Sequence, residues 1–127
     1  MNKLFVYGSL RSGCYNNPLL IRNDAKLLYP THTRSPLFDL VSFGTFPAMI
    51  LGRNKVTGEV WEVSNDLLAI LDRLEGHPRW YRRTEITVVN PFDESGVVVE
   101  AYIMPGAIEK YSEKTIDPVN GFVTWKQ

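Results

Sequence analysis

Short apolar runs separated by turn-forming residues dominate the 127-residue chain. The runs are rich in valine, isoleucine, tyrosine and phenylalanine, and glycine, proline or asparagine bounds most of them, which is typical of β-strands. A short helix is expected over residues 16–23, where Pro18 fits a first turn. Strands are expected over residues 4–7, 25–30, 36–42, 48–52, 56–63, 81–89 and 96–104. Many short strands with few helices favour a closed or nearly closed sheet.

The stretch from Ser64 to Pro78 predicts the one long helix. Ser64 is a favourable N-cap residue, and Gly76 followed by Pro78 marks the end. At about 100° per residue, one continuous arc of the helix is apolar. This arc is formed by Leu67, Leu68, Ile70, Leu71 and Leu74.

Glu75 falls inside this apolar arc, seven residues after Leu68 and four after Leu71. Burial of a carboxylate without a partner is costly and raises its pKa. The negative end of the helix dipole acts in the same direction. Glu75 is therefore a candidate general acid or base. The alternative is structural: Glu75 frays with the helix end or forms an ion pair with Arg79, Arg82 or Arg83.

Two residues of later strands are weaker pocket candidates. Arg83 lies on the same side of its strand as Tyr81, so it is placed either to balance Glu75 or to order a cavity. A structural role is the stronger interpretation for Arg83. Tyr102 lies in a late strand and is a candidate to line the pocket, although an aromatic residue there is more often part of the core.

Composition and charge favour one domain and argue against a nucleic-acid-binding protein and a membrane protein. A chain of 127 residues with 44% hydrophobic content fits one domain with one core. Its 14 basic and 14 acidic residues balance, and no cluster of basic residues predicts a nucleic-acid partner. No apolar stretch approaches the roughly 20 residues of a membrane helix or forms a signal peptide. We therefore expect no membrane association and a cytoplasmic protein.

Histidine and cysteine residues predict no metal site. The single cysteine, Cys14, has no metal-ligand spacing around it and no histidine near it in sequence, and is expected to be incidental. His32 and His77 also lack ligand spacing, and His77 fits the turn that follows the long helix. No cofactor is expected.

The loop after the first strand, Tyr7-Gly8-Ser9-Leu10, combines glycine and serine. Consecutive backbone N–H groups in such a turn form a concavity that binds anions such as carboxylate or phosphate. The glycine patterns of nucleotide-binding loops and the serine-hydrolase elbow are absent. An ordinary β-turn remains the alternative.

Several separated motifs together resemble the gamma-glutamylcyclotransferase-like family, which includes gamma-glutamylamine cyclotransferase. They are VYGSL near the N-terminus, FPAMI at 46–50, GEVWEV at 58–63, LDRLEG at 71–76 and YRR at 81–83. The resemblance runs from Leu4 to Met104. It implies an α+β fold, a single-domain mixed β-barrel flanked by a few helices. The family domain is expected over residues 1–105, and residues 106–127 form an extension that packs on it or trails from it.

The resemblance also implies an activity. The positions that match the family's loop, Tyr7, Gly8, Ser9 and Leu10, would bind the glutamyl head group of a small γ-glutamyl substrate, and Glu75 would be the catalytic acid/base. Serine stands at position 9, where relatives often have threonine, so a hydroxyl is kept. The substrate's α-amine would attack its own γ-carbonyl, releasing 5-oxoproline and an amine or amino acid, without a metal. Neither the leaving group nor an oligomeric state follows from the sequence.

A different class of function stays open, namely a non-catalytic protein of the same fold that binds a small carboxylate or γ-glutamyl ligand. Glu75 discriminates between the two classes, because a pure binding protein has no need for an ionisable group on an apolar arc. Its presence favours an enzyme.

Overall fold

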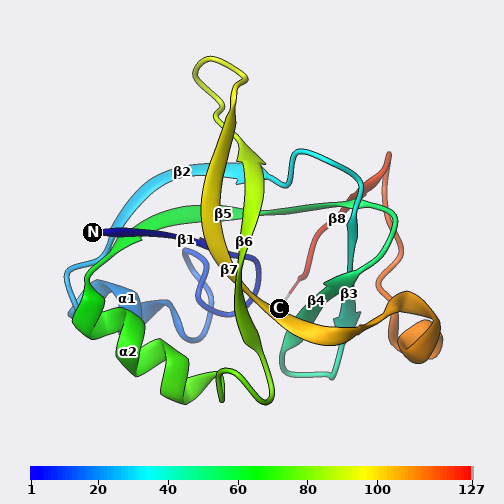
Figure 1. Ribbon diagram of the computed structural model, residues 1–127, viewed down its shortest axis with the longest axis horizontal. Coiled ribbons are helices and arrows are strands. Elements are labelled where there is room, and N and C mark those ends of the chain that lie inside the picture. The colour runs from blue at the N-terminus through cyan, green and yellow to red at the C-terminus, as the bar shows by residue number, and fades with distance from the viewer. Residues whose placement is uncertain (127) are drawn as a thin grey trace.

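The computed structural model describes residues 1–126, which form a curled mixed sheet with two α-helices and a 3₁₀ segment (Figure 1). The strands are β1 (Asn2–Val6), β2 (Lys26–His32), β3 (Phe38–Ser42), β4 (Pro47–Leu51), β5 (Lys55–Val63), β6 (Arg82–Val89), β7 (Gly96–Ala107) and β8 (Phe122–Val123). The helices are α1 (Asn17–Arg22) and α2 (Asn65–Leu74), and η1 (Ile108–Lys114) is the 3₁₀ segment.

Strand pairing curls the sheet into a small barrel. The order β2-β5-β1-β7 continues through β6, which runs antiparallel to β7 along its length, and a bridge between Thr33 and Val88 brings β6 back beside the end of β2. β1 runs parallel to β7, with Leu4 opposite Glu100. The other half of β7 pairs with β4, which carries β3 at the sheet edge. The expected α+β mixed barrel is confirmed.

Both faces of β1 are buried, which explains its uninterrupted apolar sequence. Phe5 and Tyr7 point into the barrel, where they pack in one core cluster with Val60. Leu4 and Val6 point to the other side and pack in a second cluster with Leu20 of α1, and with Trp61 of β5 and Leu67, Leu68 and Leu71 of α2. Alternation along the strand thus serves two cores, one inside the barrel and one under the helices.

The chain after Pro105 shares this core. β7 runs on to Ala107, and β8 pairs with β5. Val123 and Trp125 are buried in the same cluster as Phe5, and the Arg11 guanidinium donates a hydrogen bond to the Trp125 carbonyl. The boundary expected at residue 105 therefore falls inside a strand. None of the helices within residues 1–126 has the length and apolar character needed to cross a membrane.

Helix α2 begins and ends as its sequence predicts. The Ser64 hydroxyl accepts a hydrogen bond from the backbone N–H of Leu67 at 3.1 Å. At the other end Gly76 has a φ of +67°, and the His77 N–H reaches back to the Asp72 carbonyl at 2.9 Å. This left-handed glycine stop fixes where the last helical side chains point.

Candidate active site

Glu75 is the C-cap residue of α2, and the backbone on both of its sides is fixed. Its N–H donates to the Leu71 carbonyl at 2.8 Å, and its carbonyl accepts from the N–H of Tyr81 at 3.2 Å. The chain therefore reverses between residues 75 and 81, which places the side chains of Glu75 and Tyr81 together at one cavity. The helix end is at the bottom of Figure 1.

A cavity of about 310 Å³, here called the loop cavity, brings Glu75 to the loop that follows β1. It is formed by β1 and its loop, the β3–β4 turn, the end of α2 and the start of the β6–β7 hairpin. Its lining residues are Phe5, Val6, Tyr7, Gly8, Ser9, Leu10, Asn16, Phe46, Pro47, Leu74, Glu75, Tyr81 and Tyr102.

Side-chain contacts hold the loop rigidly against the sheet. The Tyr7 hydroxyl donates to the Tyr102 carbonyl at 2.6 Å and accepts from the Met49 N–H at 3.1 Å, so it joins β7 to β4. The Ser9 hydroxyl accepts from the Asn16 amide at 2.8 Å. Within residues 1–126, none of the hydrogen bonds of the loop uses the N–H groups of Gly8, Ser9 or Leu10 as donors. These three donors therefore have no partner among the described residues.

Position 8 requires glycine because the loop lies against Pro47. A Cβ atom on Gly8 would lie 2.8 Å from Cγ and 3.0 Å from Cδ of Pro47, and the proline ring cannot turn away. The missing side chain leaves the backbone of the loop open to the cavity.

Burial raises the pKa of the Glu75 carboxyl to about 7. No ion pair within residues 1–126 involves Glu75; the arginine of the next strand, Arg83, pairs elsewhere. The alternative of a core ion pair with Arg79, Arg82 or Arg83 is therefore wrong for the described residues. Burial and the neighbouring Glu75 charge also raise the pKa of Tyr81, whose hydroxyl donates to the Pro47 carbonyl at 3.0 Å. Glu75 thus titrates near neutral pH, while the phenol stays protonated.

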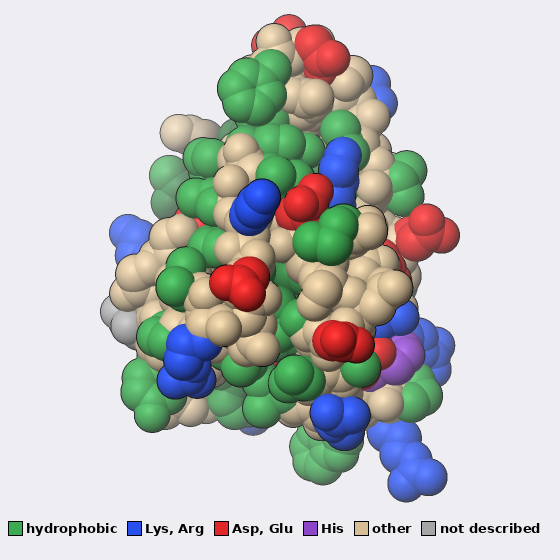
Figure 2. Space-filling view, turned by 90° about the vertical axis from the view of Figure 1, so that its left-hand side faces the viewer, with side chains coloured by type: hydrophobic (Ala, Val, Ile, Leu, Met, Phe, Trp, Pro, Cys, Tyr) green, Lys and Arg blue, Asp and Glu red, His purple; other side chains and the backbone are tan. Residues whose placement is uncertain are grey.

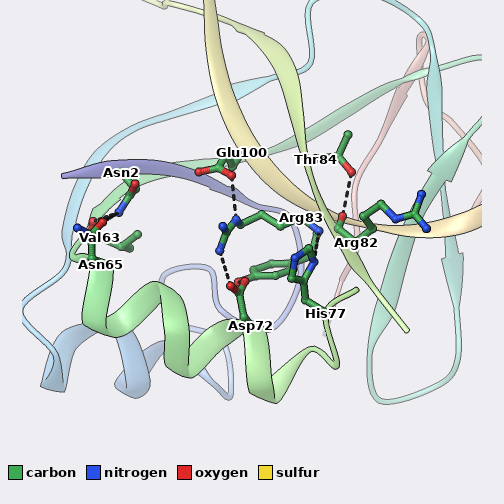
Figure 3. Close-up of polar contacts among 10 residues, drawn as sticks. Asn2, Val63, Asn65, Asp72, His77, Arg82, Arg83, Thr84 and Glu100 are labelled. Atoms are coloured by element: carbon green, nitrogen blue, oxygen red, sulfur yellow. Dashed lines mark hydrogen bonds and ion pairs between the residues drawn. The ribbon is translucent and has the colours of Figure 1, made fainter. Parts of the chain in front are cut away.

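Arg83 and Tyr102 meet at Asp72, which lies three residues before Glu75 in α2. Arg83 lies between Asp72 and Glu100, with N–O distances of 2.5 and 2.8 Å, and its backbone N–H donates to His77 (Figure 3). The Tyr102 hydroxyl donates to the other Asp72 oxygen at 2.7 Å. This network fastens the end of α2 to β6 and β7.

A second cavity, here called the rim cavity, continues from the first with about 820 Å³. Phe46, Leu74, Glu75 and Tyr81 line both cavities. The remaining lining of the rim cavity is Phe43, Arg73, Gly76, Arg79, Trp80, Met104, Pro105, Lys110 and Tyr111. Leu74 was expected to be buried on the apolar arc but is 60% exposed, because the last turn of α2 overhangs the junction of the two cavities.

The structure brings most of the expected site residues together. Tyr7, Gly8, Ser9, Leu10, Glu75 and Tyr102 line one cavity, whereas Arg83 lines neither the loop cavity nor the rim cavity. Tyr7 contributes only its ring, since its hydroxyl is bonded to the backbone.

The sequence did not lead us to predict that Pro47, Asn16 and Asp72 contribute to the site. Pro47 lies in the FPAMI motif, which could have indicated its place. Nothing local marks Asp72, which periodicity assigns to the polar face of α2.

One face of the molecule carries both signs of charge. On the face drawn in Figure 2, acidic and basic side chains are interspersed, with apolar side chains between them. Among residues 1–126, no group of three or more His, Cys, Asp or Glu residues is placed to hold a metal ion.

Comparison with known proteins gives the same family as the motifs. Residues 4–123 match the model of the family described as "Gamma-glutamyl cyclotransferase, AIG2-like". A Methanocaldococcus jannaschii protein with a provisional gamma-glutamylcyclotransferase name is 32% identical over 103 residues, which are 81% of this chain and 82% of that protein. Gamma-glutamylaminecyclotransferase C of Danio rerio is 31% identical over 109 residues, 79% of this chain and 72% of that protein.

A solved structure agrees on the fold. The crystal structure of an AIG2-like protein from Mus musculus superimposes with a TM-score of 0.79 at 24% identity, covering 100% of this chain and 97% of that chain. With the family match extending over residues 4–123, this chain belongs to the gamma-glutamyl cyclotransferase, AIG2-like family.

Proposed function

We propose that this chain is a gamma-glutamyl cyclotransferase that uses Glu75 as general acid/base. The observation that carries the proposal is a carboxyl without an ion-pair partner among the described residues, with its pKa raised to about 7, facing a loop with three available N–H donors across a cavity of about 310 Å³. A family member with these features has the parts that the reaction needs.

In this proposal the N–H groups of Gly8, Ser9 and Leu10 bind the α-carboxylate of the γ-glutamyl head group. Backbone donors on a rigid loop are a recurrent solution for anions. The head group then lies between the loop and Glu75, with its α-amine directed at the Glu75 carboxylate. Tyr7, Tyr81 and Tyr102 pack around its methylene groups, and the rings on its sides favour the folded conformer of the substrate.

The reaction is an internal transfer without a net gain or loss of water. The α-ammonium, with a pKa near 8, gives a proton to the Glu75 carboxylate. Its nitrogen then attacks the γ-carbonyl carbon, the bond from that carbon to the leaving nitrogen breaks, and the leaving nitrogen takes up the proton held on Glu75. The ring nitrogen gives up its second proton to the Glu75 carboxylate, which passes it to the same amine, so the amine departs as an ammonium and Glu75 returns to its starting state. The products are 5-oxoproline and a free amine or amino acid. The nucleophile belongs to the substrate, so the proposed steps use neither a covalent enzyme intermediate nor a metal.

The raised pKa of Glu75 suits both halves of this cycle. A carboxylate at its usual pKa of about 4.3 is a weak base for an ammonium of pKa near 8. A carboxyl of pKa about 7 is a better match for taking the proton and for returning it.

The test is 5-oxoproline release from γ-glutamyl amino acids and γ-glutamyl amines by the wild type and by Glu75→Gln. Glu85→Gln is the matched control, because Glu85 is exposed on β6 and lines neither the loop cavity nor the rim cavity. We expect release by the wild type and by Glu85→Gln, and a loss of at least 100-fold in kcat for folded Glu75→Gln. Equal rates for both variants would refute the role of Glu75.

Release by none of the proteins would favour the second class of function, a protein that binds a γ-glutamyl or carboxylate ligand without turnover. Calorimetric titration with a γ-glutamyl amino acid separates this case from a protein with no affinity for such ligands.

A further inference from the structure

The rim cavity begins where the loop cavity ends. Phe46, Leu74, Glu75 and Tyr81 line both, so a molecule whose head group fills the loop cavity extends past Glu75 into the rim cavity. If the proposed function holds, the atoms next to Glu75 belong to the bond that breaks, and the rim cavity surrounds the leaving group. Its lining residues then decide which leaving group is preferred.

Aromatic side chains form much of this lining. The rings of Phe43 and Phe46 stack with centroids 5.4 Å apart, and Tyr111 meets Phe43 edge-on at 6.3 Å. Phe46 is 44% exposed and Trp80 is 72% exposed. Large apolar groups that stay in contact with water around a cavity gain most from an apolar ligand.

The charged lining residues are nearly all cationic. Arg73 lies on α2, Arg79 in the turn after it and Lys110 in η1, so three separate elements place a positive charge around the rim cavity. Glu75 is its one acidic lining residue. Among the described residues, none of the three cations forms an ion pair. A leaving group with its own ammonium would be repelled, whereas a carboxylate would be attracted.

From this lining we infer that the rim cavity selects a leaving group with a large apolar or aromatic body and a carboxylate, namely an aromatic α-amino acid joined to the γ-glutamyl group through its α-amine. The ring packs against the aromatic wall, and the carboxylate faces the cations. The inference rests on the proposed function and adds the chemical class of the leaving group.

Three substrates separate the contribution of the ring from that of the carboxylate. γ-Glutamyl-phenylalanine carries both the ring and the carboxylate, γ-glutamyl-phenethylamine lacks only the carboxylate, and γ-glutamyl-alanine lacks only the ring. We expect the kcat/KM of γ-glutamyl-phenylalanine to exceed that of each of the others about tenfold or more, mainly through a lower KM. The advantage over γ-glutamyl-phenethylamine should shrink as salt rises from 50 to 500 mM, because the cations are exposed.

A double variant, Arg79→Gln with Lys110→Gln, tests the cations directly. Arg73 is kept, because a cation in the last turn also stabilises α2. The control is Lys3→Gln with Lys26→Gln, two exposed cations on β1 and β2 that line neither cavity. In the Arg79/Lys110 variant the preference for γ-glutamyl-phenylalanine over γ-glutamyl-phenethylamine should fall about tenfold, since each of two exposed charge contacts contributes about a few-fold in affinity. The preference over γ-glutamyl-alanine should persist, and the control should keep both preferences.

The outcomes are distinguishable. 5-Oxoproline release with the expected preferences, lost selectively in the Arg79/Lys110 variant, supports the inference. Release from all three substrates at equal kcat/KM, or a carboxylate preference that the double variant leaves intact, overturns the inference and leaves the proposed function standing. No release from any γ-glutamyl compound overturns the proposed function, and the inference with it.

Discussion

Replacing Glu75 by glutamine should make the protein more stable at neutral pH while it abolishes catalysis. The glutamine side chain has the same shape but no charge, so it removes the cost of a buried carboxylate. Folding raises the pKa of Glu75 to about 7 from the value of about 4.3 that a glutamate has in an unfolded chain. A shift of this size corresponds to nearly 4 kcal/mol, on the order of 1.4 kcal/mol per pKa unit, at a pH above both values. Since the carboxyl borders a cavity and is partly solvated, we expect about 1–3 kcal/mol.

The sign of the pH dependence follows from proton binding. Between about pH 4 and 7, the folded wild type holds a proton on Glu75 that the unfolded chain has lost. The free energy of unfolding therefore falls as pH rises through this window and levels off above pH 7. Glu75→Gln lacks this contribution, so the stability difference between the two proteins should be near zero at pH 4 and largest above pH 7.

The assay is urea unfolding of both proteins at pH 4.5, 6 and 8, followed by tryptophan fluorescence, in parallel with Glu85→Gln. Every other titrating group is common to the two proteins, so the difference isolates Glu75. A stability gap that does not change between pH 4.5 and 8 would mean that Glu75 does not titrate in this range. A wild type more stable than Glu75→Gln at pH 8 would show that the carboxylate has a favourable partner, which would refute the argument from burial.

The same pKa sets the activity profile. A general base must be ionised in the free enzyme, so kcat/KM for a γ-glutamyl amino acid should rise about tenfold per pH unit below pH 7 and level off above it. A profile that stays flat from pH 5 to 8 would contradict the role of Glu75 as the base.

Three further substitutions test the supports of the site. Gly8→Ala should destabilise the fold by about 1–3 kcal/mol and raise KM, because the new methyl group would lie 2.8 Å from Cγ of Pro47. If the urea midpoint and the KM do not change, this packing argument is wrong. Tyr7→Phe should cost about 1–3 kcal/mol in urea unfolding, since the buried Met49 N–H loses its acceptor, and a neutral effect would mean that water or another group replaces the hydroxyl. Asp72→Asn should reduce stability by about 1 kcal/mol through its contacts with Arg83 and Tyr102 while keeping the midpoint of the pH–rate profile, and a shifted midpoint would place Asp72 in the chemistry.

Helix α2 and the position of Glu75 could be predicted because their determinants are local. A serine cap, a glycine stop and a period of 3.6 residues lie within one short stretch, and they place a carboxylate beside leucine side chains without reference to the rest of the fold. Strands β1 to β7 were predicted for the same reason, since alternation and turn residues act over a few positions, whereas the short strand β8 was not predicted. The strand pattern suggested a closed or nearly closed sheet, and the Gly-Ser turn suggested an anion-binding loop. The mixed barrel flanked by helices and the binding of a glutamyl head group by that loop came from the resemblance to the family.

The residues that hold the site in place contact residues far from them in the sequence, and such contacts cannot be predicted from periodicity. Pro47 touches Gly8 only because β4 lies beside β7, which pairs with β1. Asp72 looks solvent-facing on a helical wheel, yet β6 and β7 bring Arg83 and Tyr102 to it. Leu74 fits the apolar arc by angle, but it lines the two cavities and is 60% exposed.

In the proposed function, Glu75 carries out catalysis and the rim cavity determines specificity, and different parts of the structure hold the two. The carboxyl is held by the cap of α2 and by the turn that leads to Tyr81, which are fixed by backbone hydrogen bonds and by a buried core. The cations of the rim cavity are instead exposed side chains on α2, the following turn and η1. A substitution at Arg79 or Lys110 removes little buried area, so its effect on the free energy of unfolding should be small. The leaving-group preference can therefore change by a few surface substitutions while the loop cavity and Glu75 keep their geometry.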